Sequence, residues 1–159
     1  MKNDTDQNNL HCQFMSLAIN EAKKAYMNGE VPVGAIIVKN NQILSRSFNK
    51  SILEDDPTSH AEINAIREAC SQVKNYRLCN VSLYVTLEPC AMCYGAIVHS
   101  RIKEVIFGAY DKKTGVCGSC NKLYESSCFN HRPRIIGGVH ELQCSLLLKD
   151  FFNNKRIKK

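Results

Sequence analysis

Two short segments carry side chains that bind metal ions, and the fold has to bring these segments together for them to act as one site. The first contains His60 and Glu62 in the order His-Ala-Glu, and the second contains Cys90 and Cys93 in the order Pro-Cys-Ala-Met-Cys. Each segment follows a loop or a strand and stands at the start of a helical pattern. If the two helix N-termini converge, one imidazole and two thiolates surround a single site.

The spacing within each segment suits this arrangement. Cys90 and Cys93 are three positions apart and therefore share one face of a helix. Pro89 is expected at the first helical position, where proline is best tolerated, and the positive end of the helix dipole favours thiolates there. Thr58 and Ser59 are the expected N-caps of the upstream helix.

Three protein ligands are typical of a catalytic zinc site, because structural zinc sites are usually closed by four. Two thiolates and a neutral imidazole balance the charge of the ion but weaken it as a Lewis acid, so a bound water benefits from a nearby carboxylate base. A redox pair of cysteines is a weaker interpretation, because it leaves His60 and Glu62 without a role. We therefore expect one Zn²⁺ per subunit, held by His60, Cys90 and Cys93, with Glu62 as the catalytic residue.

Length and composition favour a protein that stays in the cytoplasm. The chain has 159 residues, its polar start contains no apolar signal-peptide region, and its longest apolar run is far shorter than the ~20 residues that span a bilayer. In that reducing compartment, nine cysteines suggest metal binding, catalysis or apolar filling and not disulfides. The net charge of +6 is concentrated at the C-terminus, which is either a solvated tail or a contact for nucleic-acid phosphates; the residues are Lys155, Arg156, Lys158 and Lys159.

Hydrophobic patterns predict an α/β fold. The pattern indicates helices over 10–28, 61–70, 90–100 and 141–155, and strands over 33–40, 42–49, 81–87, 104–110 and 134–139. Asn40 and Asn41 form a credible hairpin turn, which makes the sheet mixed. We expect three layers, α/β/α, with about five strands, in a single domain over 1–159 that has a flexible polar N-terminus (about 1–9) and a basic C-terminal tail (about 153–159).

The order H-A-E followed by P-C-x-x-C resembles the signature of the zinc-dependent nucleoside and nucleobase deaminases. Stretches such as "VPVGAIIV", "DPTSHAEINAIREA", "LYVTLEPCAMCYGAIVHSRI" and "LLKDFFNNKR" are similar to the members of that family that act on tRNA, from about Phe14 to Arg156. The resemblance implies a cytidine deaminase-like fold, a homodimer that binds the tRNA anticodon arm, and hydrolytic deamination of the wobble adenosine to inosine. Glu62 would move protons between water and the adenine ring.

The same resemblance implies further contacts to the substrate, each of which has an ordinary structural alternative. Asn49 would hydrogen-bond the target nucleoside or else be a turn residue, and Val31 and the backbone near Ala91 would be pocket walls or plain packing. The contacts to RNA would come from Asp111, Lys113, Arg132 and Phe152. The chain departs from the family pattern at Phe48 and Tyr110, where tryptophan and arginine are common.

Two other functions remain open from the sequence. One is deamination of a free base or nucleoside, such as guanine or cytidine, on the same fold; the Asn-His-Arg segment, the last helix and the basic tail count against it. The other is a zinc-stabilised RNA-binding module, against which Glu62 counts. A second C-x-x-C, formed by Cys117 and Cys120, could bind another metal with Cys128, but we interpret it as an inert loop.

Overall fold

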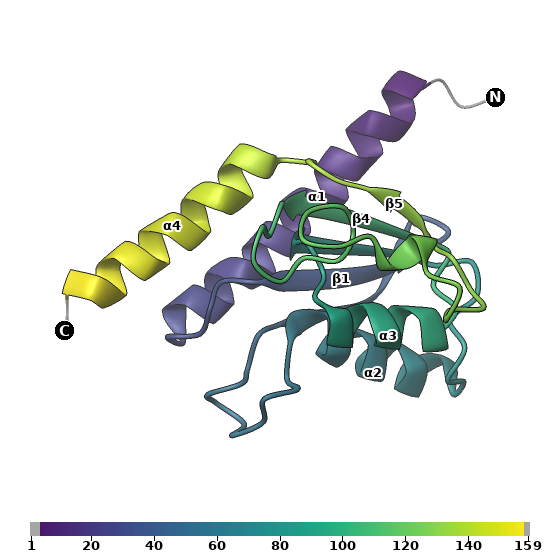
Figure 1. The fold of residues 1–159 in the computed structure, drawn as a ribbon, viewed down its shortest axis with the longest axis horizontal. Coiled ribbons are helices and arrows are strands. Elements are labelled where there is room, and N and C mark those ends of the chain that lie inside the picture. The colour runs from purple at the N-terminus through teal and green to yellow at the C-terminus, as the bar shows by residue number, and fades with distance from the viewer. Residues whose placement is uncertain (1–3, 158–159) are drawn as a thin grey trace.

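The computed structural model describes residues 4–157, and helices alternate with strands around one sheet (Figure 1). The helices are α1 (Asp4–Met27), α2 (Ala61–Val73), α3 (Ala91–His99) and α4 (Glu141–Ile157), with one 3-10 turn at Leu123–Glu125. The strands are β1 (Gly34–Lys39), β2 (Gln42–Phe48), β3 (Ser82–Leu87), β4 (Glu104–Ala109) and β5 (Arg134–Ile136).

The sheet is mixed, as the sequence predicts. Its strand order is β2-β1-β3-β4-β5; β1 pairs antiparallel with both β2 and β3, whereas β3, β4 and β5 are parallel. The predicted turn of the first hairpin is confirmed: Asn40 and Asn41 have φ angles of 50° and 61°, the left-handed conformation that a tight hairpin needs and that asparagine adopts readily.

Helices cover both faces of the sheet and give the predicted three layers (Figure 1). Helices α1 and α4 pack on one face, and α2 and α3 on the other. Consecutive residues of a strand serve opposite faces, so Ile36 packs with α1 residues such as Met15, while Ile37 packs with α2 residues such as Ala65. Because both faces are buried, the inner strands are apolar throughout, which is why their sequences are easy to recognise.

Both ends of the chain differ from the prediction. Helix α1 begins at Asp4 and not near Leu10, because extending an already packed helix needs no new nucleation even through polar residues. Helix α4 continues to Ile157, so most of the predicted basic tail is helical. Residues 1–3, Lys158 and Lys159 lie outside the described residues. Over residues 4–157, no helix has the length and apolar character needed to cross a membrane.

Candidate active site

The N-terminal ends of α2 and α3 bring His60, Cys90 and Cys93 together. The Nδ1 atom of His60 lies 3.8 Å from Cys90 Sγ and 3.5 Å from Cys93 Sγ. A tetrahedral zinc ion with bonds of about 2.05 Å to nitrogen and about 2.3 Å to sulfur separates such atoms by about 3.6 Å. Both nitrogen–sulfur separations therefore suit a single zinc ion, and the group offers three protein ligands from within residues 4–157, which leaves a fourth tetrahedral position open.

Two of the three metal-binding residues occupy helix N-cap positions. His60 caps α2 and Cys90 caps α3, both with extended backbones, and neither side chain bonds to its own helix. The prediction of Thr58 and Ser59 as N-caps, and of Pro89 at the first helical position, is wrong by one or two residues. The two hydroxyls are used elsewhere, because Thr58 Oγ1 donates to Asp56 and Ser59 Oγ donates to Glu54.

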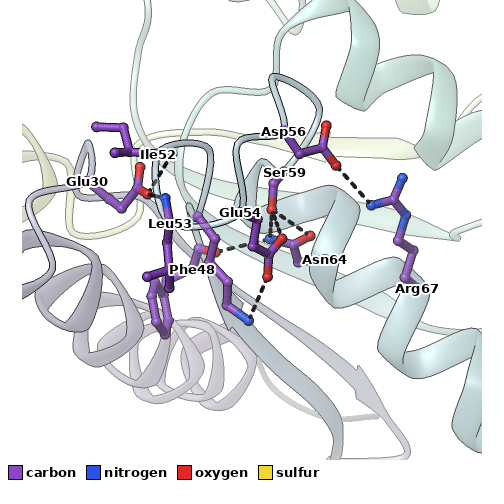
Figure 2. Close-up of polar contacts among 10 residues, drawn as sticks. Glu30, Phe48, Ile52, Leu53, Glu54, Asp56, Ser59, Asn64 and Arg67 are labelled. Atoms are coloured by element: carbon purple, nitrogen blue, oxygen red, sulfur yellow. Dashed lines mark hydrogen bonds and ion pairs between the residues drawn. The ribbon is translucent and has the colours of Figure 1, made fainter.

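The loop that leads from β2 to His60 is held by side chains on both sides (Figure 2). The carboxylate of Glu30, which is buried, accepts hydrogen bonds from the backbone N–H groups of Ile52 and Leu53, both at 2.8 Å. Closer to His60, Asn64 Nδ2 donates to the Ser59 hydroxyl at 2.9 Å. The histidine therefore stands on a segment whose start and end are both fixed.

Glu62 is buried, with 4% of its surface exposed, and it lies beside His60 at the wall of a cavity. Burial raises the pKa of Glu62 to about 7, so its carboxyl group can both take up and release a proton near neutral pH. A hydrogen bond from the Cys93 thiol lowers the pKa of Cys90 to about 4, and the same bond raises the pKa of Cys93. The lowered pKa of Cys90 favours its thiolate, the form that binds metal.

The cavity beside these residues has a volume of about 210 Å³. Of the substrate-binding residues predicted from the sequence, Val31, Asn49 and Asp111 line it. Asn49 Oδ1 accepts a hydrogen bond from the first backbone N–H of α2 at 2.9 Å, which fixes the side chain and keeps its amide N–H₂ group available for a ligand. The lining residues that the sequence did not single out are Val33, Leu87, Glu88 and Thr114.

The other predicted residues lie outside this cavity. Ala91 is exposed at the start of α3, next to Cys90, and Lys113 is exposed on the loop after Asp111. Phe152 lies on α4 and is 44% exposed, with its ring edge-on to the buried Phe151. None of these three residues lines the cavity, so any contact that they make with a substrate would be at the surface.

Arg132 belongs to a second, basic cleft of about 490 Å³. This cleft lies past the C-terminal end of α3, whereas the metal-binding group is at the N-terminal end of the same helix. Four cationic side chains line it, and over residues 4–157 none of them pairs with a carboxylate. They are Arg77, Arg101, Lys103 and Arg132.

The second C-x-x-C motif does not form a comparable group. Cys117 is buried, whereas Cys120 and Cys128 are exposed. Within the part of the chain that the structure describes, His60, Cys90 and Cys93 form the one group of three metal-binding side chains close enough to share an ion.

Comparison with known proteins gives consistent results. The profile of the cytidine and deoxycytidylate deaminase zinc-binding region matches residues 8–109, more than half of the chain. The tRNA-specific adenosine deaminase of Haemophilus influenzae is 46% identical over 148 residues, which cover 92% of this chain and 86% of that protein. The enzyme of the same name from Bacillus subtilis is 45% identical over 146 residues, covering 92% and 91%.

Solved structures are similar as well. A structure from biochemical and structural studies of A-to-I editing by tRNA:A34 deaminases at the wobble position of transfer RNA superposes with a TM-score of 0.84. It is 39% identical, and the match covers 86% of this chain and 99% of that one. A guanine deaminase from Bacillus subtilis is also 39% identical, but it matches with a TM-score of 0.59 over 62% of this chain and 63% of its own.

Proposed function

The chain belongs to the cytidine and deoxycytidylate deaminase family, and from this premise we propose that it converts adenosine to inosine by hydrolysis at the wobble position of a tRNA anticodon. The curated relatives that are 46% and 45% identical carry the name of this activity. The observation that carries the proposal is the buried Glu62 beside the group formed by His60, Cys90 and Cys93, with Glu62, His60 and Cys90 lining one cavity. We propose that residues 1–159 act as a single deaminase domain.

The residues around the cavity have separate roles in this reaction. His60, Cys90 and Cys93 would hold the zinc ion, which would supply a water molecule of lowered pKa as the nucleophile for C6 of adenine. Glu62 takes a proton from that water, delivers one to the ring nitrogen, and assists the departure of the amine as ammonia. Asn49 donates its amide N–H₂ group to the nucleoside. The cavity of about 210 Å³ is small, so the adenosine has to leave its stack in the anticodon loop to reach it.

The basic cleft supports binding to RNA. Its arginines and lysine have no carboxylate partners among residues 4–157, so they are available to phosphates. Because the cleft and the cavity are at opposite ends of α3, we propose that an anticodon arm in one cavity reaches the cleft of a partner subunit. The active protein would then be a cytoplasmic homodimer. Asp111, Lys113, Arg132 and Phe152 would add contacts to the RNA.

The similarity to a guanine deaminase favours one alternative, which is deamination of a free base. The two functions are separated by incubating the zinc-loaded protein with tRNA, and separately with adenosine, guanine and cytidine. Inosine is read by sequencing the tRNA, and ammonia release is measured for the free compounds. We expect inosine at the wobble position; ammonia from the free compounds alone would overturn the proposal. A protein that binds zinc and tRNA without deaminating any of these substrates would instead be an RNA-binding module.

A further inference from the structure

Glu88 is a buried carboxylate that the proposed chemistry does not use. Only 2% of the residue is exposed, and over residues 4–157 it forms no ion pair with a lysine or arginine. Its Oε1 atom accepts the backbone N–H groups of Cys117 at 2.9 Å and Ser119 at 3.0 Å. Its Oε2 atom accepts the backbone N–H of Asp111 at 2.9 Å and the hydroxyl of Ser119. One carboxylate is therefore satisfied by four donors from a single loop.

The loop is shaped to close around this carboxylate. A Cβ atom on Gly115 would lie 2.5 Å from Glu88 Oε2 and 2.5 Å from the carbonyl oxygen of Asp111, so only glycine fits there. The backbone on either side of the carboxylate is paired as well: the N–H of Val116 donates to Pro89 at 3.0 Å, and the N–H of Glu88 donates to the carbonyl of Ala109 at 2.8 Å.

The opposite side of the loop is a wall of the cavity. Asp111 and Thr114 line it together with Glu62. The two loop residues are joined to each other, since the Thr114 hydroxyl donates to Asp111 Oδ2 at 2.6 Å and its backbone N–H donates to Asp111 Oδ1 at 3.2 Å. The hydrogen bond from the Asp111 N–H to Glu88 therefore connects this wall to the segment that ends in the metal-binding Cys90.

We propose that Glu88 is a positioning residue for the substrate. Its carboxylate holds Asp111, and through it Thr114, at a fixed place in the cavity, and so sets the affinity for the nucleoside while Glu62 performs the proton transfers. The inference rests on the proposed function for its substrate. The anchoring of Asp111 itself can be tested without any substrate.

Glu88→Gln is a selective change because of the way the four donors are divided. The new N–H₂ group can donate to the Ser119 hydroxyl, which can also accept, but it cannot accept the N–H of Asp111. The amide oxygen, in the place of Oε1, still accepts from Cys117 and Ser119. The substitution therefore leaves the Asp111 N–H as the unpaired donor. Ser119→Ala is the matched control, since it removes the other bond to Oε2 and keeps the Asp111 bond.

The test measures steady-state kinetics on an anticodon stem-loop RNA, zinc content, and hydrogen exchange of the Asp111 amide. For Glu88→Gln we expect KM to rise roughly ten-fold, the effect of one lost hydrogen bond to a charged group, with kcat within about two-fold and zinc unchanged. Exchange of the Asp111 amide should become faster. Ser119→Ala should leave KM and this exchange close to those of the unmodified protein.

Gly115→Ala is a second way to displace the Asp111 loop, because its methyl group pushes the loop off Glu88 without altering the carboxylate. If Glu88→Gln fails to fold, the KM of Gly115→Ala tests the proposal instead. An unchanged KM, an equal rise for Ser119→Ala, or a fall in kcat at constant KM would overturn the proposal. If the unmodified protein deaminates only a free base, the proposed function fails. The KM values of Glu88→Gln and Ser119→Ala are then compared with that base as substrate. Hydrogen exchange of the Asp111 amide still measures directly whether Glu88 anchors Asp111.

Discussion

The two sides of the cavity are built in different ways. On one side, His60 and Cys90 are the N-cap residues of two helices, so the helix starts place them. On the other side, Asp111 stands on a loop that is held by a carboxylate from a distant part of the sequence. The proposed roles follow this difference: the residues assigned to the chemistry stand at the starts of helices, whereas Asp111, assigned to the substrate, stands on a loop that can change without disturbing them.

The largest effect is expected on the helix side, from Cys90→Ser. A hydroxyl is a poor substitute for a thiolate ligand, so we expect the protein to lose its zinc and all deaminase activity. Cys120→Ser is the control, because Cys120 is exposed and belongs to no metal-binding group of the described chain. Zinc per chain, measured by atomic spectroscopy beside the inosine assay, checks both. Full zinc retention in Cys90→Ser would mean that the ligand set is wrong.

The next largest effect is expected from Glu62→Ala, which separates the contribution of metal binding from that of proton transfer. We expect zinc to stay bound while turnover falls by about 10²- to 10⁴-fold, the usual contribution of a general acid–base group. Glu68→Ala on the exposed face of the same helix should leave both unchanged. Zinc analysis with single-turnover inosine formation measures the difference. Loss of the metal together with activity would contradict the role given to Glu62.

A smaller effect is expected in the basic cleft, from the double variant Arg77→Gln and Arg101→Gln. Each lost phosphate contact should lower the slope of log K against log salt by about 0.7 to 0.9, so tRNA binding should weaken and become less sensitive to salt. Turnover at saturating RNA should not change. The control replaces Lys23 and Lys149, which are exposed outside the cleft, by glutamine. Equal slopes for the two double variants would remove the cleft from RNA binding.

The smallest effect is expected from Phe152→Ala. The ring is 44% exposed, so its loss should alter the free energy of unfolding by less than about 0.5 kcal/mol. If it stacks on a base of the anticodon loop, the Kd for tRNA should rise about five-fold, near the lower limit for one stacked base. Leu146→Ala, at a position 53% exposed on the same helix, is the control in a fluorescence titration. Equal Kd values for the two variants would leave Phe152 without a role in binding.

The helix side of the cavity was predictable because its information is local. The order and spacing of His60, Glu62, Cys90 and Cys93 indicate both the metal and the base, and apolar strands buried on two faces indicate the sheet. The residues that cap the two helices were not predictable. Thr58 and Ser59, which are good capping side chains, precede α2, but their hydroxyls bond to Asp56 and Glu54 in a loop whose shape the local sequence does not determine.

The loop side and the basic cleft depend on contacts between distant segments. Glu88 gave one weak signal, an acidic residue directly after an apolar strand, but its partners lie 23 to 31 positions later in the chain. The arginines and lysine of the cleft come from separate segments. The net charge of +6 therefore drew attention to the C-terminus, where basic residues are consecutive, and not to the place where the fold gathers them.

The metal-binding residues at the two helix starts tie the folding of this protein to its metal supply. Neither α2 nor α3 has a side chain that satisfies its first backbone N–H groups from the N-cap position. An ion shared by His60 and Cys90 would clamp the two starts to each other. Since zinc binds the folded chain in preference to the unfolded one, resistance to heat and proteolysis should increase with the free zinc concentration, and a chelator should loosen these two helix ends first.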